Sequence, residues 1–261
     1  MHELFQQLDF DHIPFKEDYK PFISTEYADK LFRSPTNGNP PLISRGGQGL
    51  GDIISTVQFA YHLAEELSTP VGVSWKAWKP REGVRRKLTE VIPTLGPDFE
   101  DRVFISDEVW CNYGKAMWPW YYSVPYFPAY KTHKDISSRI ALLQLDGKTC
   151  AGQKNLPEGQ VGELTDYLTN AGLKVVPWTY ADTDGSVIPL KYWIETLANA
   201  EIFFGVDSGG AHMAHCTKTP KIVFINNYAH STLDPKKSSH RNEAFVHFKD
   251  FHDFKQKIES L

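Results

Sequence analysis

Two glycine-rich segments each follow an apolar run, precede a helical pattern and carry an aspartate. They are residues 44–52, Ser-Arg-Gly-Gly-Gln-Gly-Leu-Gly-Asp, and residues 206–212, Val-Asp-Ser-Gly-Gly-Ala-His. In the second segment, the order strand, glycines, helix gathers backbone N–H groups at a helix N-terminus, which favours an anion and above all a diphosphate. Gly209 and Gly210 would let the backbone approach that ligand closely, because glycine has no Cβ. The alternative is an Asp or Ser N-cap followed by a flexible turn.

Alternating strand and helix patterns surround both segments and must position them. This alternation predicts an α/β fold with parallel sheets and helices on both faces. The expected strands are 42–44, 71–75, 102–105, 140–145, 174–176, 202–206 and 222–225. The expected helices are 52–67, 82–92, 158–171, 190–199, 209–217 and 248–261.

The patterns form two series, which divide the chain into an N-terminal domain, residues 1–133, and a C-terminal domain, residues 134–261. Ligands of parallel α/β sheets bind beyond the carboxyl ends of the strands. Both glycine-rich segments lie at such ends, so both should face one cleft. Residues 1–38 form an arm that we expect to pack onto the body. The aromatic, proline-punctuated residues 110–133 form a long loop of the kind that is usually functional or a linker.

Composition narrows the class of protein. The chain has 261 residues, of which 41% are hydrophobic, and a formal net charge of −4. A protein with this net negative charge is not expected to be attracted as a whole to nucleic acids or anionic membranes. The three cysteines, at positions 111, 150 and 216, lack metal-ligand spacing and indicate a reducing compartment. No run approaches the roughly 20 apolar residues of a membrane span, and the N-terminus lacks signal-peptide features. We therefore expect a cytoplasmic protein without integral membrane contact.

Three short motifs occur together in this chain. The first is Gly-x-Gly-Asp-Ile-Ile-x-Thr at 49–56, and the second is Val-Asp-Ser-Gly-x-x-His-x-Ala at 206–214. The third is Lys-Asn-Leu-Pro at 154–157, which is similar to a Lys-x-Trp-Pro motif with leucine in place of tryptophan. Together they resemble the lipopolysaccharide heptosyltransferases of glycosyltransferase family 9. The resemblance covers about residues 42–67 and 139–225.

This resemblance implies the GT-B fold, in which two Rossmann-like domains face a central cleft and the C-terminal one binds a nucleotide-diphosphate sugar. It also implies inverting transfer to an acceptor hydroxyl without a metal or another cofactor. Asp52 matches the base that deprotonates the acceptor, and a helix N-cap is its alternative role. The Asp-x-Asp at 182–184 is a metal-binding signature in the other large glycosyltransferase fold. Here it lies in a glycine-containing loop and is better interpreted as a solvated turn.

The donor-binding residues follow from the same resemblance. Lys154 and the backbone N–H groups of residues 208–211 would stabilise the leaving diphosphate, although Lys154 could be an exposed loop lysine. Asp207 would cap the helix or orient Lys154 or the donor ribose. His212 would donate to phosphate or be a satisfied core histidine. The candidate donor-binding residues are Lys154, Trp178, Asp207, Ser208, Gly209, Gly210 and His212.

Cations interleaved with tryptophans follow the second expected strand, and further tryptophans lie in the aromatic loop. This combination suits phosphate contacts with base stacking, and equally the phosphorylated sugars of lipopolysaccharide. A solvated basic helix face is the alternative. By analogy, such a pattern is also what we expect of a phage enzyme that glycosylates hydroxymethylated bases in DNA. The candidate acceptor-binding residues are Arg45, Gln48, Lys76, Trp78, Lys79, Arg81, Trp118 and Trp120.

The sequence leaves three functions open. The favoured one is a glycosyltransferase that uses a nucleotide sugar, with a modified DNA base slightly preferred over a lipopolysaccharide-type glycan as acceptor. A non-catalytic nucleotide-binding protein is the second. A dinucleotide-dependent oxidoreductase is disfavoured, because neither glycine-rich turn has Gly-x-Gly-x-x-Gly with an acidic residue about 20 residues on.

Overall fold

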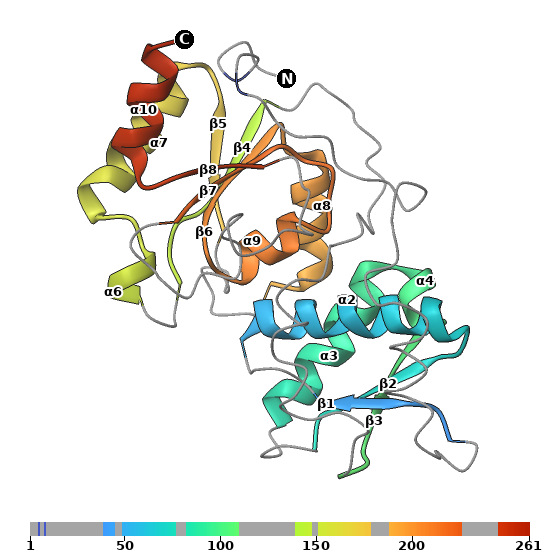
Figure 1. Ribbon diagram of the computed structural model, residues 1–261. Helices are drawn as coiled ribbons and strands as arrows, with labels where there is room; N and C mark the ends of the chain where they lie inside the picture. The colour runs from blue at the N-terminus through green and yellow to red at the C-terminus, as the bar shows by residue number, and fades with distance from the viewer. Residues whose placement is uncertain are drawn as a thin grey trace.

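The computed structural model describes residues 5, 8, 39–44, 49–76, 82–109, 139–147, 151–178, 188–225 and 245–261. Two parallel sheets with helices packed against them confirm the predicted α/β class (Figure 1). The strands are β1 (Leu42–Ser44), β2 (Val71–Ser74), β3 (Val103–Ser106), β4 (Ile140–Gln144), β5 (Lys174–Pro177), β6 (Ile202–Val206), β7 (Lys221–Phe224) and β8 (Phe245–Phe248). The helices are α2 (Leu50–Leu67), α3 (Glu82–Leu95), α4 (Pro97–Glu100), α6 (Ala151–Lys154), α7 (Glu158–Asn170), α8 (Leu190–Asn199), α9 (Gly209–Ala214) and α10 (Phe251–Glu259).

The smaller sheet has the strand order β1-β2-β3, and every neighbouring pair is parallel. Its central strand β2 is buried at every position. Gly72 lies between Leu42 and Phe104, whose side chains close over it from the two outer strands: a Cβ at position 72 would lie 2.7 Å from Phe104 Cζ and closer still to Leu42 Cδ2. Glycine at this position therefore permits the packing across the sheet.

The larger sheet is also parallel throughout, with the order β5-β4-β6-β7-β8. The chain first adds β5 on one side of β4 and then crosses to build β6, β7 and β8 on the other side. Such a reversal is the topological switch point at which doubly wound sheets bind their ligands, beyond the carboxyl ends of the two strands. Gln144 ends β4 and Val206 ends β6, so the residues that follow these two lie at the switch point.

Helix α2 is buried on more than the one face that its apolar pattern predicts. Every residue from Ile53 to Ala64 is buried, including the polar Ser55, Gln58 and His62. The reason is that α2 packs between the smaller sheet and α9, which belongs to the larger sheet. Across this contact, Gln58 Nε2 donates a hydrogen bond to Cys216 Sγ at 3.4 Å. The buried Gln58 thus has its partner in the other half of the chain.

One hydrophobic cluster consequently extends through both halves of the chain. It includes Ile43 and Val73 of the smaller sheet together with Leu142 and Phe203 of the larger one. Such a shared core argues against two independently packed bodies, although the residue limits of the predicted domains stay a prediction. A second cluster lies on the opposite face of the larger sheet, under α7 and α10.

The N-terminal arm contributes to this second cluster. Phe5 and Leu8 are buried there, and the rings of Phe5 and Phe204 meet edge to face with centroids 5.9 Å apart. At these two positions the expectation that the arm packs onto the body is confirmed. Cys216 is a free, buried thiol, while Cys111 and Cys150 lie outside the described residues. None of the described helices has the length and apolar character needed to cross a membrane.

Three described elements were not expected from the sequence. Helices α4 and α6 each comprise 4 residues, which is too short to give a helical period. Strand β8 pairs with β7 at the sheet edge, and its four residues show too little alternation to predict it. The C-terminal helix begins at Phe251 rather than near 248, because Asp250 Oδ1 accepts a hydrogen bond from Asp253 N at 3.1 Å and caps it.

We expect Gly72→Ala to lower the free energy of unfolding by about 1–3 kcal/mol, the usual cost of overpacking a tight core. Urea denaturation with tryptophan fluorescence would measure it. Gly83→Ala is the matched control, since a Cβ at position 83 meets nothing within 4 Å. Its stability should not fall, because alanine is favoured over glycine in a helix by up to about 1 kcal/mol. Equal midpoints for the two variants would contradict the packing assigned to Gly72.

Candidate functional site

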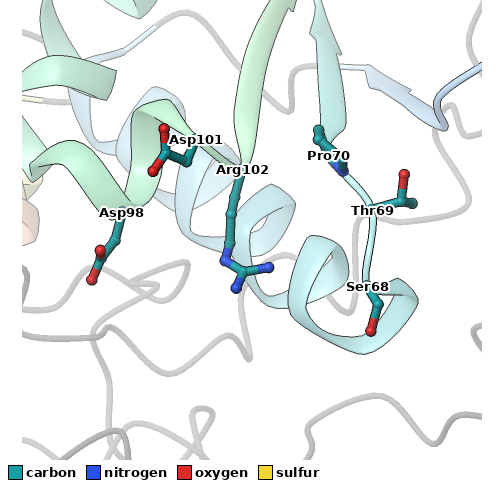
Figure 2. A pocket seen from close by; sticks show the side chains of 6 residues that line it. All are labelled: Ser68, Thr69, Pro70, Asp98, Asp101 and Arg102. Carbon is teal, nitrogen blue, oxygen red and sulfur yellow. The ribbon is translucent and has the colours of Figure 1, made fainter.

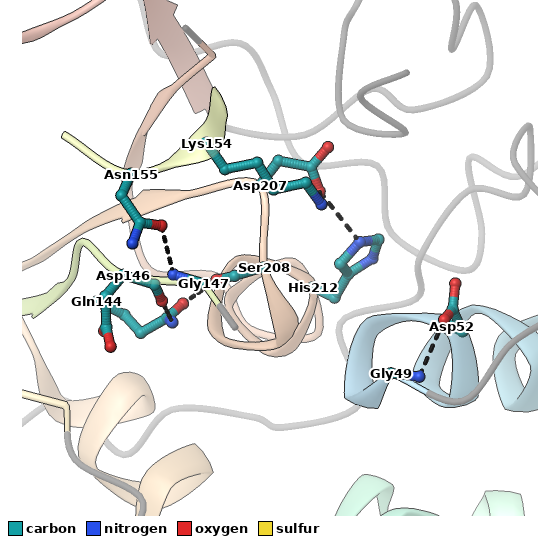
Figure 3. Close-up of polar contacts among 10 residues, drawn as sticks. All are labelled: Gly49, Asp52, Gln144, Asp146, Gly147, Lys154, Asn155, Asp207, Ser208 and His212. Atoms are coloured by element: carbon teal, nitrogen blue, oxygen red, sulfur yellow. Dashed lines mark hydrogen bonds and ion pairs between the residues drawn. The ribbon is translucent and has the colours of Figure 1, made fainter. Parts of the chain in front are cut away.

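The loops at the switch point are joined by a polar network around the buried Gln144, which links the end of β4 to the end of β6 (Figure 3). Gln144 has no exposed surface. Its Nε2 donates to the carbonyl of Asp146, and its Oε1 accepts a hydrogen bond from Ser208 Oγ. Beside them, Gly147 N donates to Asn155 Oδ1 at 2.6 Å. The loops after β4, α6 and β6 therefore form one fixed surface at the carboxyl edge of the sheet.

An ionic cluster lies on this surface. Asp207 Oδ1 is 3.9 Å from Lys154 Nζ and 3.8 Å from His212 Nε2, so the carboxylate stands between the two basic side chains (Figure 3). Both separations exceed a hydrogen bond, so these contacts are electrostatic. The three side chains are 6%, 14% and 7% exposed, in the order Asp207, Lys154, His212. Charges this well shielded from water act more strongly on a bound ion than surface charges do.

This cluster joins three of the predicted donor-binding residues. Lys154 lies at the end of α6 with most of its side chain covered, rather than on an exposed loop. Of the roles expected for Asp207, orientation of Lys154 agrees with the short distance between them. Capping of α9 does not: the N-cap residue is Ser208, and no side-chain hydrogen bond caps the helix.

The glycines of the second segment contact protein side chains, not open space. A Cβ at Gly209 would lie 2.8 Å from Leu50 Cβ on α2, and a Cβ at Gly210 would lie 2.5 Å from Gln144 Oε1. We expected glycine at these two positions to leave room for a ligand. The structure corrects that expectation: Gly209 leaves room for helix α2, and Gly210 leaves room for the Gln144 side chain. Contact between their backbone N–H groups and a donor stays a prediction.

Asp52 lies in the first turn of α2 and is half-buried. Its Oδ2 accepts a hydrogen bond from Gly49 N at 3.0 Å, so the N-terminal capping contact is present. The preceding residue, Gly51, packs directly against the His212 ring: a Cβ at position 51 would lie 2.9 Å from His212 Nε2. The first turn of α2 is therefore adjacent to the ionic cluster, although the two segments are about 155 residues apart in the sequence.

Trp178 is 4% exposed and stacks on Trp193, with ring centroids 4.5 Å apart and an interplanar angle of 9°. Its backbone N donates to Leu143 O at 2.6 Å, which continues the pairing of β5 with β4. These contacts assign the ring to packing of the core and leave little of its area for a nucleotide. The donor-binding role of Trp178 stays a prediction.

Of the candidate acceptor residues, the described part of the chain includes Lys76. Its Nζ lies 5.1 Å from the centroid of the Trp75 ring and 3.9 Å from Asp107 Oδ1. Arg85 approaches the same ring, with Cζ at 6.0 Å. A cavity of about 540 Å³ lies beside Arg85 at the start of α3. Helix α3 directly follows β2, just as α2 directly follows β1, so both helices begin at the carboxyl edge of the smaller sheet. The remaining candidates lie outside the described residues: Arg45, Gln48, Trp78, Lys79, Arg81, Trp118 and Trp120.

Gln144 and Asn155 are members of the polar network at the switch point that were not predicted from the sequence. A signal was present for Gln144, because a glutamine at the end of the run Ile-Ala-Leu-Leu-Gln interrupts an otherwise apolar strand. Its partners were not predictable, since Ser208 is 64 positions away in the sequence. Asn155 directly follows Lys154, and nothing in its local pattern distinguishes it from an ordinary turn residue.

A smaller cavity of about 200 Å³ lies at the opposite edge of the smaller sheet, between Pro70, just before β2, and Arg102, just before β3 (Figure 2). Its size is below the range typical of pockets for drug-sized ligands, and Arg102 Nε lies 2.5 Å from Glu65 Oε1. Among the described residues, no group of three or more His, Cys, Asp or Glu side chains is placed to hold a metal ion. The Asp-x-Asp at 182–184 lies outside those residues.

We expect Gln144→Met to lower the free energy of unfolding by about 1–3 kcal/mol, because methionine fills the volume and deprives Ser208 and the Asp146 carbonyl of their shared partner. Thermal and urea unfolding would measure the change. Gln153→Met is the control, since Gln153 is exposed on α6. If both variants unfold like the parent protein, the network does not hold the loops together.

Comparisons with known proteins give weak similarities. No family model matches the chain, and a search of curated proteins finds no match. Among solved structures, the iron-containing dodecameric glycosyltransferase TibC from enterotoxigenic E. coli is 14% identical, with a TM-score of 0.49 over 71% of this chain and 57% of that chain. This chain thus spans little more than half of TibC.

Two further E. coli structures cover more of the chain. ADP-heptose lipopolysaccharide heptosyltransferase II is 15% identical, with a TM-score of 0.48 over 84% of this chain and 96% of that one. Heptosyltransferase WaaC, solved with ADP, is 14% identical, with a TM-score of 0.46 over 85% of this chain and 97% of that one. Similarities at this level carry no argument about a reaction or a substrate.

Proposed function

We propose that this protein is a metal-independent glycosyltransferase that moves a sugar from a nucleotide-diphosphate sugar to an acceptor hydroxyl. The observation that carries the proposal is the contact between Gly51 and His212. It brings a half-buried carboxylate, Asp52, next to a shielded cluster that contains Lys154 and His212. A base on one side, with the lysine cation and further hydrogen-bond donors on the other, is what sugar transfer from a diphosphate requires.

The proposed reaction is a single displacement that inverts the anomeric carbon. Asp52 accepts the proton of the acceptor hydroxyl, and the acceptor oxygen forms a bond to the anomeric carbon of the sugar. The bond between that carbon and the diphosphate oxygen breaks, and its electron pair leaves with the diphosphate. Lys154 and the backbone N–H groups near Ser208 stabilise the charge that develops there. Asp207 holds Lys154 in position for this contact.

The position of the cluster supports a donor site there. It lies beyond the carboxyl ends of β4 and β6, at the point where the strand order of the larger sheet reverses. Doubly wound sheets bind nucleotides at this point. The fixed network around Gln144 supplies the rigid support that a catalytic constellation needs.

We propose a glycan as the acceptor, in the manner of the heptosyltransferases that the motifs resemble. The cavity at the start of α3 lies at the carboxyl edge of the smaller sheet, as does Asp52. Its described lining carries two cations, Arg85 and Arg86, and one anion, Glu82, and this excess of positive charge suits an anionic sugar. Phage DNA as acceptor has less support. Of the residues predicted to contact DNA, Lys76 alone lies in the described part of the chain, and no contact described there favours a nucleic acid over a glycan.

A nucleotide panel tests the donor site. At 100 times its dissociation constant, a bound nucleoside diphosphate or its sugar should add about 2.7 kcal/mol to stability, which corresponds to a rise of roughly 5–10 °C in the melting temperature. Lys154→Ala should abolish most of this rise, and Lys191→Ala, an exposed lysine on α8, should leave it intact. A panel in which no nucleotide raises the melting temperature would exclude the donor site.

Asp52→Asn tests the base. Asparagine Oδ1 still accepts the hydrogen bond from Gly49 N, so the fold should persist, while kcat should fall by about 10²–10⁴-fold. The measurement is release of nucleoside diphosphate from the donor found above, with lipopolysaccharide-core glycans and with hydroxymethylated DNA as acceptors. Asp98→Asn, an exposed carboxylate at the opposite edge, is the control. Unchanged turnover in Asp52→Asn would rule out Asp52 as the base, and donor binding without turnover in the parent would indicate a non-catalytic nucleotide-binding protein.

A further inference from the structure

We infer that Gly51 is a positioning residue, through which helix α2 fixes the ring of His212 against the donor side of the site. The inference rests on the proposed function, because it assigns a role in donor binding to a residue of the first half of the chain. It goes beyond that function in naming a residue that touches neither the donor nor the acceptor in the proposed reaction.

The geometry of the contact is tight. A Cβ at position 51 would lie 2.9 Å from His212 Nε2, 3.0 Å from Cγ and closer still to Cδ2. Ordinary contacts of a Cβ begin at 3.4 Å, so the ring lies against the bare backbone of α2. Any side chain at position 51 would force the ring to move by about half an ångström or more. Gly51 has an ordinary helical position within α2, so backbone freedom does not explain the glycine.

The ring has little room in which to move. The His212 side chain is 7% exposed, and its backbone N donates to Ser208 O at 3.2 Å inside α9. On the same face of α9, one turn earlier, Gly209 packs against Leu50, so α9 itself is held against α2. A displaced ring therefore moves relative to Asp207, whose Oδ1 is 3.8 Å from His212 Nε2, and that shift reaches Lys154 through the same carboxylate.

A chain of contacts thus runs from the proposed base to the proposed diphosphate site: Asp52, Gly51, His212, Asp207 and Lys154. Misplacement of catalytic groups by about an ångström can cost on the order of 10²-fold in rate. The bare Cα of Gly51 sets the spacing at the one point in this series where the two halves of the chain meet.

Gly51→Ala tests the assignment. We expect this variant to bind the nucleoside diphosphate selected by the panel about tenfold or more weakly, measured by isothermal titration calorimetry. Gly162→Ala is the matched control: it is also a glycine within a helix, and a Cβ there meets nothing within 4 Å. The control should bind as the parent does. Parent-like affinity in Gly51→Ala would overturn the inference and leave the proposed function standing.

His212→Ala separates positioning from a general loss of packing. If Gly51 acts through the ring, Gly51→Ala should have no further effect on affinity in a His212→Ala background, and the double variant should fold even where Gly51→Ala alone does not. Additive losses of affinity, or a double variant that fails to fold while His212→Ala folds, would overturn the inference. A parent protein that binds no nucleotide would remove the proposed function and this inference with it.

Discussion

The close packing of α2 on α9 is the constraint on which the rest of this structure depends. Glycines at two positions make it possible, since Gly51 accommodates the His212 ring and Gly209 accommodates Leu50. A helix–helix approach this near needs small residues at the crossing and allows no substituent there. It joins the hydrophobic cores of the two halves and brings together groups that belong to different sheets. Residues that are far apart in the sequence therefore lie side by side in the structure.

The larger sheet positions the remaining groups of the site. Its strands are parallel and their ends converge on one edge, where Gln144 binds both its own loop and Ser208. A buried amide with both ends engaged fixes the relative position of two loops more strictly than apolar contact would. Lys154, Asp207 and His212 stand on this support. Their burial makes the electrostatic field at the edge stronger than the same charges would produce in water.

Most of the helices and strands could be predicted from the sequence, because each has its own pattern of apolar and polar residues. The apolar run ending at Val206 and the pattern of 190–199 define their strand and helix without reference to any partner. The contacts between residues of the site could not be predicted from the local sequence. The pairing of Gln144 with Ser208 and the meeting of Gly51 with His212 depend on how distant segments pack. The sequence shows where these glycines stand, but it does not show which neighbouring side chain packs against each of them.

Because α2 is enclosed from two directions, its completion depends on the order in which the chain is made. The described strands of the smaller sheet are complete once residue 106 has been synthesised, yet Gln58 on α2 meets Cys216 only when that residue follows about a hundred positions later. A ribosome that adds about 5–20 residues per second leaves this contact unmade for several seconds. The contact between α2 and α9 therefore forms late in synthesis, after the described strands of the smaller sheet are complete.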